Sequence, residues 1–520
     1  MSTEDPTRPV SHGPATPGTE LDEDSRLLAE MGYTQELHRG MSAFSNFAVS
    51  FSIISILAGC ITSYGIALRS GGPSTIVLGW AIVGVMVTCV ALSMAEVCSR
   101  FPTAGGLYFW AGQLATRNKR QWAWTVGWFN FLGEIAVTAA IDFGCATTWM
   151  AFASITWGVN VTATSTFLVF LAVILAHAML NTFGVNLVSL LSNISAWWHV
   201  VGVLVIVAVL WILPDHHQTV GWTLTGWHNE TGWSFTPYVF LMGLLMAQYT
   251  YTGYDASAHV AEETRQAQHS APRGIVMSVV VSVVGGFILL YSITAAIPDK
   301  SAQGLDRLLN TDTGLPPAQI FFDALGNPTM AKFLLFIVCV AQFFCGMASV
   351  TANSRMSFAF SRDNALPGSR LWKKVNQRTG TPTNSIWLCV TCSIILTVPA
   401  LFNTTAYLAV TSIAVIGLYI AYVAPVFLRR MHPEFQVGPW HLGRWSPLIG
   451  WTAVVWVVII CVLFVLPPVS PITVDTFNYA PVAVLAVVLF AIVSWFIGGR
   501  QHFMRGREDA YTTKSLDEIL

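Results

Sequence analysis

Charged residues are scarce in this 520-residue chain, and their scarcity limits the classes of protein it can belong to. Asp, Glu, Lys and Arg make up 10% of the sequence, whereas hydrophobic residues make up 54%. A soluble domain carries about a quarter charged residues, so this composition excludes a soluble globular protein of this length. The formal net charge of −1 also gives no basis for binding nucleic acid.

Motifs for nucleotide and metal chemistry are missing as well. The chain contains no GxxxxGK loop, no HExxH sequence and no Cys/His cluster at metal-ligand spacing. These absences argue against an ATP-driven pump and a membrane metalloprotease. We therefore predict no catalytic residue, no cofactor and no metal, and we expect that the protein is not an enzyme.

Long apolar runs are abundant. A helix needs about 20 apolar residues to cross a bilayer, and we count twelve such runs between Phe44 and Ile497. The predicted fold is an all-α integral membrane protein with transmembrane helices over residues 44–69, 75–98, 123–155, 165–184, 190–213, 235–260, 273–297, 329–359, 383–402, 405–428, 447–467 and 478–498.

The distribution of Lys and Arg predicts how these helices are oriented, because short cytoplasmic loops retain basic residues. With the N-terminus inside, only Arg69, Lys300, Arg307 and Lys332 fall outside. Both termini are then cytoplasmic. We expect a disordered tail over 1–42, a transporter domain over 43–500 and a second tail over 501–520, in the cell (plasma) membrane.

The predicted sixth span turns polar halfway across the membrane. Within the run 248–263 it carries Gly253, Asp255, Ser257 and His259. Unpaired backbone groups in hydrocarbon cost several kcal/mol each, so an irregular backbone at this depth must face a cavity, an ion or a substrate. The run predicts half of a binding site in a transporter. We expect Glu262 and Glu263, at its end, to meet cytoplasmic water or an Arg of a loop.

The first span has a similar weak point at Ala58, Gly59 and Cys60, followed by Thr62. Such small residues also serve merely to let helices pack closely. The pairing of an interrupted first span with an interrupted sixth span favours an inverted repeat of two five-helix halves. These halves cover about 44–213 and 235–428, and two accessory helices lie within 447–498.

The predicted third span carries a polar stripe of Asn130, Glu134, Thr138 and Asp142, at intervals of four residues. This spacing places the four on one helical face. Carboxyl groups inside a membrane are candidates for proton relay or cation recognition. The alternative is a hydrogen-bonding stripe between helices, and a salt bridge from Glu134 to a loop Arg would also satisfy that carboxylate.

Two further spans carry isolated polar groups. His199 in the fifth span could exchange a proton during transport, or it could be a buried neutral imidazole. Gln342, Ser349 and Asn353 share one face of the eighth span and could bind substrate or a cation. Arg355 and Arg362 beyond them are expected to be cytoplasmic anchors.

Three motifs resemble those of amino acid-polyamine-organocation (APC) superfamily permeases. They are the segments 96–108 after the second span, 354–367 after the eighth, and 253–264, which resembles the amino acid/choline branch with its gamma-aminobutyrate (GABA) permeases. Segments 140–144 and 272–275 also match this branch. The resemblance covers about residues 30–500 and implies a LeuT-like five-plus-five inverted repeat with helices 1 and 6 discontinuous.

The resemblance also implies which residues touch substrate. Its amino acid members bind the ligand on the unwound parts of helices 1 and 6 and close an aromatic gate over it. The matching positions are Ala58, Gly59, Cys60, Ile61 and Thr62, the gate Tyr249, and Thr252, Gly253, Tyr254, Asp255 and Ala256. Several members carry a Lys where this chain has His199. The exchangers that need a disulfide-linked heavy chain have a Cys between spans 3 and 4, and 154–165 contains none.

We therefore predict a permease that takes up an amino acid or GABA by alternating access, coupled to protons rather than sodium. The proton-coupling candidates are Asp142, His199, Glu134 and Asp255. The alternatives are a choline or polyamine transporter, an amino acid exchanger and a nutrient receptor that does not transport. The only expected partners are the small substrate, protons and the lipid bilayer.

Overall fold

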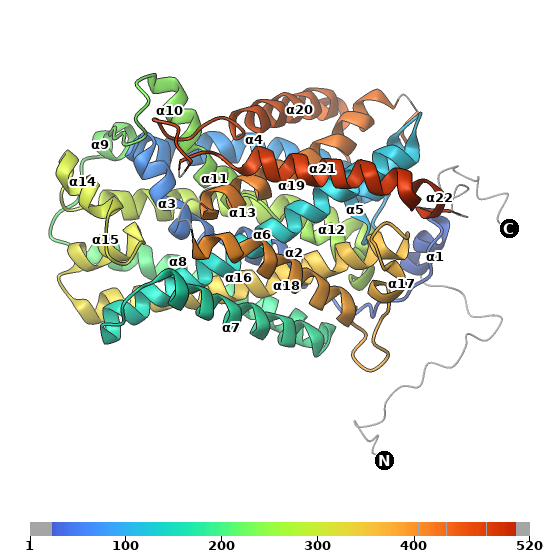
Figure 1. The fold of residues 1–520 in the computed structure, drawn as a ribbon, viewed down its shortest axis with the longest axis horizontal. Helices are drawn as coiled ribbons and strands as arrows, with labels where there is room; N and C mark the ends of the chain where they lie inside the picture. Colours follow the sequence, from blue (N-terminus) through green and yellow to red (C-terminus); the bar gives the residue numbers. More distant parts are fainter. Residues whose placement is uncertain (1–22, 403–405, 433, 475, 506–520) are drawn as a thin grey trace, which may run out of the picture.

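The computed structural model describes residues 23–402, 406–432, 434–474 and 476–505. Within these ranges the chain is helical, with two isolated β-bridges and no β-strand. Figure 1 shows the long helices side by side along the longest axis of the molecule. This arrangement is the one that a bilayer imposes, because a helix satisfies its own backbone hydrogen bonds.

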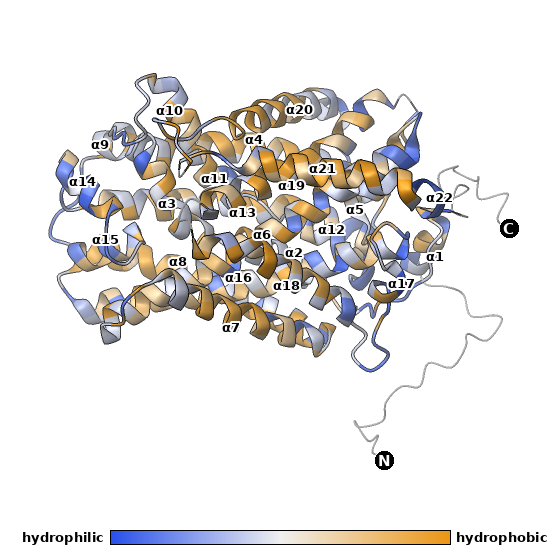
Figure 2. Cartoon of the chain, in the orientation of Figure 1, coloured by the Kyte–Doolittle hydropathy of each residue, from blue (hydrophilic) through white to orange (hydrophobic). Residues whose placement is uncertain are grey.

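Eleven segments of the described chain are long and apolar enough to cross a membrane. They are Ala43–Arg69 (α2, Ala43–Ile54, with α3, Gly59–Arg69), Pro73–Arg100 (α4), Lys119–Trp157 (α6), Ala163–Thr182 (α7), Val185–Ile212 (α8), Ala267–Ala295 (α13), Pro328–Arg362 (α16), Thr383–Leu401 (α18, Thr383–Thr397, and a 3-10 turn), Tyr407–Met431 (within α19, Ala406–Met431), Gly443–Leu463 (a 3-10 turn and α20, Ser446–Leu463) and Ala480–His502 (α21, Ala480–Ser494, with α22, Arg500–His502). Their apolar faces give the bundle the predominantly hydrophobic colouring of Figure 2.

The predicted sixth span is a series of short pieces. These are α10 (Thr236–Gly243), α11 (Leu245–Thr250), α12 (Ala256–His259) and a 3-10 turn over Ala261–Glu263. No piece is long enough to cross a membrane by itself, so eleven spans are found where twelve are predicted. The twelve-helix count and the inverted repeat stay predictions.

The helices differ in how deeply they are buried. Residues are 78% buried in the apolar part of Ala43–Arg69 but only 11% buried in that of Ala480–His502. Leu485, Leu489 and Phe496 of the latter are exposed, as suits a helix facing lipid chains. The first span therefore lies at the centre of the bundle, and the last one lies on its surface.

The bundle has two distinct ends (Figure 1). The end with α1 (Glu23–Glu30), α17 (Ser369–Trp372) and α22 (Arg500–His502) is called the tail end here. The opposite end, called the loop end, carries α9 (Val220–Thr225), α14 (Ala302–Leu309) and α15 (Pro316–Leu325). A short helix, α5 (Gly106–Leu114), follows α4.

The predicted tail over 1–42 is described from residue 23 onward, and residues 1–22 lie outside the described chain. Residues 23–42 form α1 and a segment that contacts the bundle. The Asp24 carboxylate accepts hydrogen bonds from the N–H groups of Gln266 and Ala267 at 2.7 and 3.0 Å. Met41 forms a parallel β-bridge with Thr264. This part of the tail is ordered because it caps α13, whose first N–H groups have no partner within the helix.

Candidate functional site

The first span is interrupted between Ile54, where α2 ends, and Gly59, where α3 begins. Ser55 has a φ of 34°, in the left-handed region that a non-glycine residue rarely adopts. The break occupies residues 55–58, slightly before the predicted segment 58–62. The local sequence favours this break because Ser55 and Gly59 stabilise a helix poorly. The small side chain of Ala58 adds no bulk beside them.

The sixth span is interrupted between Thr250, where α11 ends, and Ala256, where α12 begins. Gly253 has a φ of 85°, and a Cβ at this position would lie 2.1 Å from Cγ2 of Ile53. Only glycine fits both the backbone angle and the space. The N–H of Gly253 donates to the hydroxyl of Tyr422 at 3.1 Å. The sixth-span break therefore packs against the end of α2, next to the first break.

A small cavity of about 10 Å³ lies between the two breaks, α6 and α16. Of the predicted site residues, Gly59, Tyr249, Thr252 and Gln342 line it; its other lining residues are Ile53, Ile54, Ile141, Thr250 and Cys345. None of these nine residues carries a charge.

The other predicted substrate-binding residues do not line this cavity: Ala58, Cys60, Ile61, Thr62, Gly253, Tyr254, Asp255 and Ala256. Tyr254 instead packs its ring against Tyr422, with centroids 4.9 Å apart. Tyr249 lines the cavity at the position predicted for an aromatic gate and is 3% exposed.

Gln342 is the polar side chain of α16 at the cavity. Its Nε2 donates to the carbonyl of Ile141 at 3.0 Å, and its Oε1 is buried without a hydrogen-bond partner. A buried acceptor without a donor costs about 1–3 kcal/mol. A ligand N–H in the cavity would supply that donor.

Asp255 lies just beyond the cavity in a buried cluster with Glu134 and His259. The three side chains offer ligand atoms that all lie within 4.8 Å of one another, and all three are at most 1% exposed. Glu134 comes from α6, whereas Asp255 and His259 come from the sixth-span break and α12. We call this group the acidic triad.

Hydrogen bonds fix the acidic triad to its surroundings. The Tyr422 hydroxyl donates to Asp255 Oδ1 at 2.6 Å, and Asn130 Nδ2 donates to Oδ2 at 3.4 Å. His259 Nδ1 lies 2.9 Å from the carbonyl of Ala104, and its Nε2 lies 3.2 Å from Asp255 Oδ2. Tyr422 thus joins this carboxyl to the N–H of Gly253 in the break.

The geometry of the acidic triad determines which protons it must hold. A carbonyl only accepts, so His259 Nδ1 carries a proton. Its Nε2 then either accepts from a protonated Asp255 or carries a second proton. Glu134 Oε1 has no hydrogen-bond partner. Two carboxylates this close cannot both stay ionised in a buried site, so the group holds at least one exchangeable proton.

Asp142 forms a second buried pair, with a residue that is absent from the predicted site. Its Oδ1 lies 2.9 Å from Nδ1 of His177 in α7, and both side chains are fully buried. A Cβ on Gly346 would lie 2.0 Å from the same carboxylate oxygen, so α16 packs directly on the pair. The other carboxylate oxygen, Oδ2, and the other ring nitrogen, Nε2, are buried without hydrogen-bond partners.

His199 is satisfied by its neighbours. One ring nitrogen, Nε2, lies 2.6 Å from the hydroxyl of Ser55 in the first break, and Nδ1 lies 2.7 Å from the carbonyl of Ser195. The imidazole therefore hydrogen-bonds to Ser55, the residue of the break that has the left-handed φ. Both ring nitrogens thus have hydrogen-bond partners, and a role of His199 in proton exchange stays a prediction.

Ser349 and Asn353 of α16 bind the polar stripe of α6 and not the cavity. The hydroxyls of Ser349 and Thr138 are 2.8 Å apart, and Asn353 Nδ2 donates to Thr138 Oγ1 at 3.2 Å. Half of the predicted α6 stripe thus faces α16, whereas Asn130 and Glu134 face the sixth-span break.

Glu262 and Glu263 meet Arg side chains, which is one of the two outcomes expected for them, but these Arg residues lie on α16 and are buried. The expectation that Arg355 and Arg362 are cytoplasmic anchors is wrong. Glu263 pairs with Arg355 at 2.9 Å, and Glu262 pairs with Arg362 at 2.7 Å, and all four residues are buried. All four residues therefore lie inside the bundle, where a buried charge needs a partner of opposite charge.

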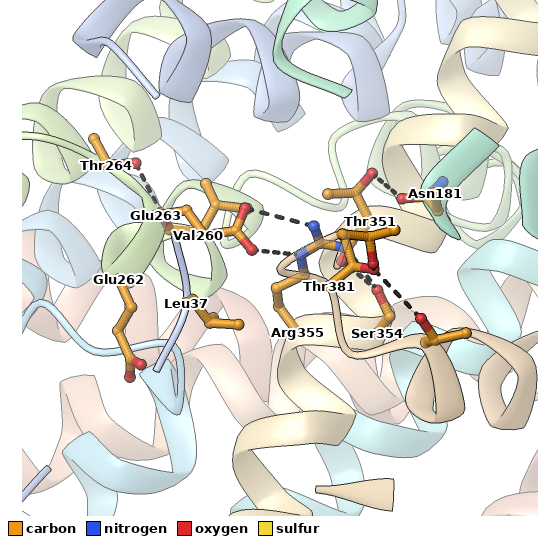
Figure 3. A network of polar contacts seen from close by, with 12 residues as sticks. Leu37, Asn181, Val260, Glu262, Glu263, Thr264, Thr351, Ser354, Arg355 and Thr381 are labelled. Atoms are coloured by element: carbon orange, nitrogen blue, oxygen red, sulfur yellow. Dashed lines mark hydrogen bonds and ion pairs between the residues drawn. The ribbon is translucent and has the colours of Figure 1, made fainter. Parts of the chain in front are cut away.

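Figure 3 shows how the first of these pairs continues into a wider network. The Arg355 guanidinium points at the Glu263 carboxylate and also donates to Ser354, while Thr351 beside it donates to Asn181. The Arg362 guanidinium also lies over the ring of Tyr33, 4.0 Å from its centroid. These contacts close the bundle between the cavity and the tail end.

Sequence reasoning missed His177 and left His259 out of the coupling candidates. His177 is a histidine within an apolar stretch, which is the signal that selected His199. His177 was not singled out because its partner Asp142 lies 35 residues away on another helix. His259 stands four residues after Asp255, so helical spacing alone could have paired them.

Comparison with known proteins gives a consistent result. The sequence model of the amino acid permease family matches residues 41–490. The chain is 42% identical over 501 residues to "Amino-acid permease BAT1" of Arabidopsis thaliana, covering 93% of this chain and 96% of that protein. It is 31% identical over 469 residues to the "GABA-specific permease" of Saccharomyces cerevisiae, covering 88% and 81%. The chain therefore belongs to the amino acid permease family of the APC superfamily, whose named relatives are transporters and not enzymes.

Proposed function

We propose that this permease takes up a small zwitterionic amino compound, an amino acid or GABA, together with protons by alternating access. The observation that carries the proposal is the enclosed cavity between two broken helices, with the proton-holding acidic triad attached to one of them. The names of the relatives support an amino acid as substrate. The cavity is only about 10 Å³, so a substrate fits there only when the helices around it move apart, as alternating access requires.

The ends of the broken helices supply the charges that a zwitterion needs. Gly59, the first residue of α3, lines the cavity, and the first N–H groups of a helix attract a carboxylate. The ammonium group then meets backbone carbonyls of the sixth-span break and the unpaired Oε1 of Gln342. A purely cationic choline or polyamine is disfavoured, because none of the nine lining residues is a carboxylate.

The acidic triad, which contains two of the four candidate residues, Glu134 and Asp255, is the best proton-coupling site. The triad holds the proton on His259 Nδ1 and, in this proposal, two more protons shared among the Glu134, Asp255 and His259 side chains. Its net charge is then zero, and the loss of one shared proton leaves a buried negative charge. Glu134 belongs to α6, whereas Asp255 belongs to the break. Movement of α12 relative to α6 would separate the two carboxyls and change their proton affinity, which is what coupling requires.

The other two candidates are less suited to this role. His199 lies against the first break, but its two ring nitrogens are already satisfied by Ser55 and Ser195. Asp142 and His177 pair between α6 and α7, and neither belongs to a broken helix.

For orientation, we propose that the tail end is cytoplasmic. The buried pairs Glu262–Arg362 and Glu263–Arg355 then form the inner gate, and Tyr249 lies toward the outer side of the cavity. The segment 23–41 covers this gate from inside. Inward release of substrate requires these contacts to open.

The test is uptake by the purified protein in proteoliposomes, with radiolabelled GABA, neutral, acidic and basic amino acids, choline and a polyamine. Proton and sodium gradients are varied independently. We expect a zwitterion to accumulate with an inward proton gradient and without regard to sodium.

Each alternative has a distinct outcome in this assay. Uptake that followed sodium and ignored pH would overturn proton coupling. Preference for choline or the polyamine would make the protein an organocation transporter. A requirement for unlabelled amino acid inside the vesicles would make it an exchanger, and saturable binding without uptake would make it a receptor.

A further inference from the structure

Three metal-binding side chains converge at the loop end, far from the acidic triad. His228 and Glu230 lie in the segment between α9 and α10, and Asp306 lies on α14. They offer ligand atoms that all lie within 4.8 Å of one another. His228 Nε2 is 3.2 Å from Asp306 Oδ1 and 3.9 Å from Glu230 Oε1.

The backbone holds His228 and Glu230 rigidly. The carbonyl of His228 accepts from the N–H of Gly71 at 2.8 Å, and the N–H of Glu230 donates to the carbonyl of Arg69 at 2.9 Å. A Cβ on Gly72 would lie 2.8 Å from the backbone nitrogen of His228. Both residues are therefore fixed on the end of α3, where a metal site needs preorganised ligands.

The imidazole of His228 points into this cluster without a satisfied partner. The side chain is 8% exposed, and its Nε2 forms no hydrogen bond, although Asp306 is close. A buried ring nitrogen in this situation is expensive unless something binds it. A metal ion would take its lone pair.

The two carboxylates carry negative charge that the protein does not fully balance. Arg69 reaches only Glu230 Oε2, at 3.9 Å, and leaves Oε1 facing the imidazole. Glu230 and Asp306 place two carboxylates beside the same imidazole nitrogen, where their charges repel each other. A cation between the two carboxylates would remove this repulsion.

We propose that His228, Glu230 and Asp306 form a binding site for a divalent transition metal ion, with Zn²⁺ as the best fit. One imidazole with two carboxylates suits Zn²⁺, which binds both ligand types and often leaves a fourth position to water. Mg²⁺ and Ca²⁺ prefer oxygen ligands alone, so the histidine selects against them. Asp306 has 46% of its side chain exposed, which gives an ion a path from solvent.

A metal ion here would tie together two parts of the loop end. Asp306 moves with α14, which packs on α3 and α15, whereas His228 and Glu230 follow the end of α3. If the loop end faces outside, as proposed above, external Zn²⁺ holds α14 against the outer half of the first span and slows transport. This consequence rests on the proposed function, but binding of the metal does not.

The binding test uses the purified full-length protein after treatment with a chelator. Zn²⁺ is titrated by calorimetry, and thermal stability is measured with and without Zn²⁺. We expect one ion per chain and a higher melting temperature. Asp306→Asn and His228→Gln should each weaken binding at least about tenfold and abolish the thermal shift.

Matched controls come from the same end of the molecule. Asp312→Asn and His216→Gln each remove an exposed residue of the same type outside the cluster, so both should bind Zn²⁺ like the unmodified protein. Asp306→Asn changes a half-exposed residue, so its fold should be intact without metal. No binding by the unmodified protein, equal binding by Asp306→Asn, or a thermal shift with Ca²⁺ and none with Zn²⁺ would overturn the proposal. Inhibition of uptake is measured separately, so loss of transport and loss of metal binding are told apart.

Discussion

At the scale of single residues, Asp255 is the residue that would connect the proposed substrate site with the proposed proton site. It belongs to the sixth-span break and contacts Tyr422 and His259. We predict that Asp255→Asn retains substrate binding but loses proton-driven accumulation. One pH unit across the membrane is worth about 1.4 kcal/mol per proton, or about tenfold accumulation, and this gain should disappear. Uptake against a pH gradient, with substrate binding measured in parallel, checks the prediction.

Asp142→Asn is the matched comparison, since it also removes a buried carboxyl from a pair with histidine. We expect it to retain most of the dependence on the pH gradient. If Asp142→Asn abolished coupling and Asp255→Asn left it unchanged, the proton would be carried by the Asp142–His177 pair and not by the acidic triad.

Gly59 is a second residue whose role can be tested, because it sets the distance between the two broken helices. A Cβ at this position would lie 2.7 Å from Cγ2 and 2.9 Å from Oγ1 of Thr250. We predict that Gly59→Ala lowers the free energy of unfolding by about 1–3 kcal/mol through overpacking and strongly reduces transport. Thermal unfolding and uptake measure the two effects.

A second substitution separates this steric effect from a loss of backbone flexibility. Thr250→Ala removes both clashing atoms, so the double variant Gly59→Ala/Thr250→Ala should regain much of the stability and transport. If the double variant were no better than Gly59→Ala alone, the clash with Thr250 would not be the cause.

The residues also show where sequence reasoning reaches its limit. Gly253 and Asp255 could be predicted to lie in a break, because polar residues and glycine in an apolar span have a local signature. The pairing of Glu134 with Asp255, across 121 positions, has no such signature. Arg355 and Arg362 were assigned to the surface for the same reason: their partners Glu263 and Glu262 are brought to them only by tertiary packing.

At the scale of helices, two buried ion pairs join α16 to the 3-10 turn Ala261–Glu263, which follows α12. Breaking one by removing a single partner leaves a buried charge, which costs about 3–5 kcal/mol. We predict that Glu263→Gln and Arg355→Met each lower the free energy of unfolding by about this amount. The double variant should be less destabilised than the sum of the two, because neither charge is left alone. Thermal unfolding of the three variants forms the measurement.

The same cycle distinguishes a gate from a permanent clamp. If the pair opens during transport, the cavity of the double variant should open toward the tail end more often. Efflux of preloaded substrate should then be faster. Arg26→Met serves as the control, because its pair with Glu30 is exposed and contributes little. Additive effects of the two buried substitutions would contradict the proposed pairing energy.

At the scale of the whole molecule, the class of fold follows from composition and apolar length, because the bilayer permits few alternatives. The eleven described spans match predicted ones closely, such as α4 over Pro73–Arg100 against 75–98. The sixth span differs because its interruptions divide it into pieces. The ordered segment 23–42 could not be predicted, since its apolar residues Leu28, Tyr33 and Leu37 are few and bury against helices far along the sequence.

The orientation of the whole bundle gives the last prediction. Arg69, Lys300, Arg307 and Lys332 lie toward the loop end, whereas the basic residues of the loops at the tail end, such as Arg265 and Arg378, are more numerous. Because basic loops stay inside, an epitope inserted beside the exposed His216 should be labelled on intact cells, and one at the C-terminus only after permeabilisation. The reverse labelling pattern would show that the bundle has the opposite orientation in the membrane. The pairs Glu262–Arg362 and Glu263–Arg355 would then form an outer gate, and only internal Zn²⁺ could reach His228.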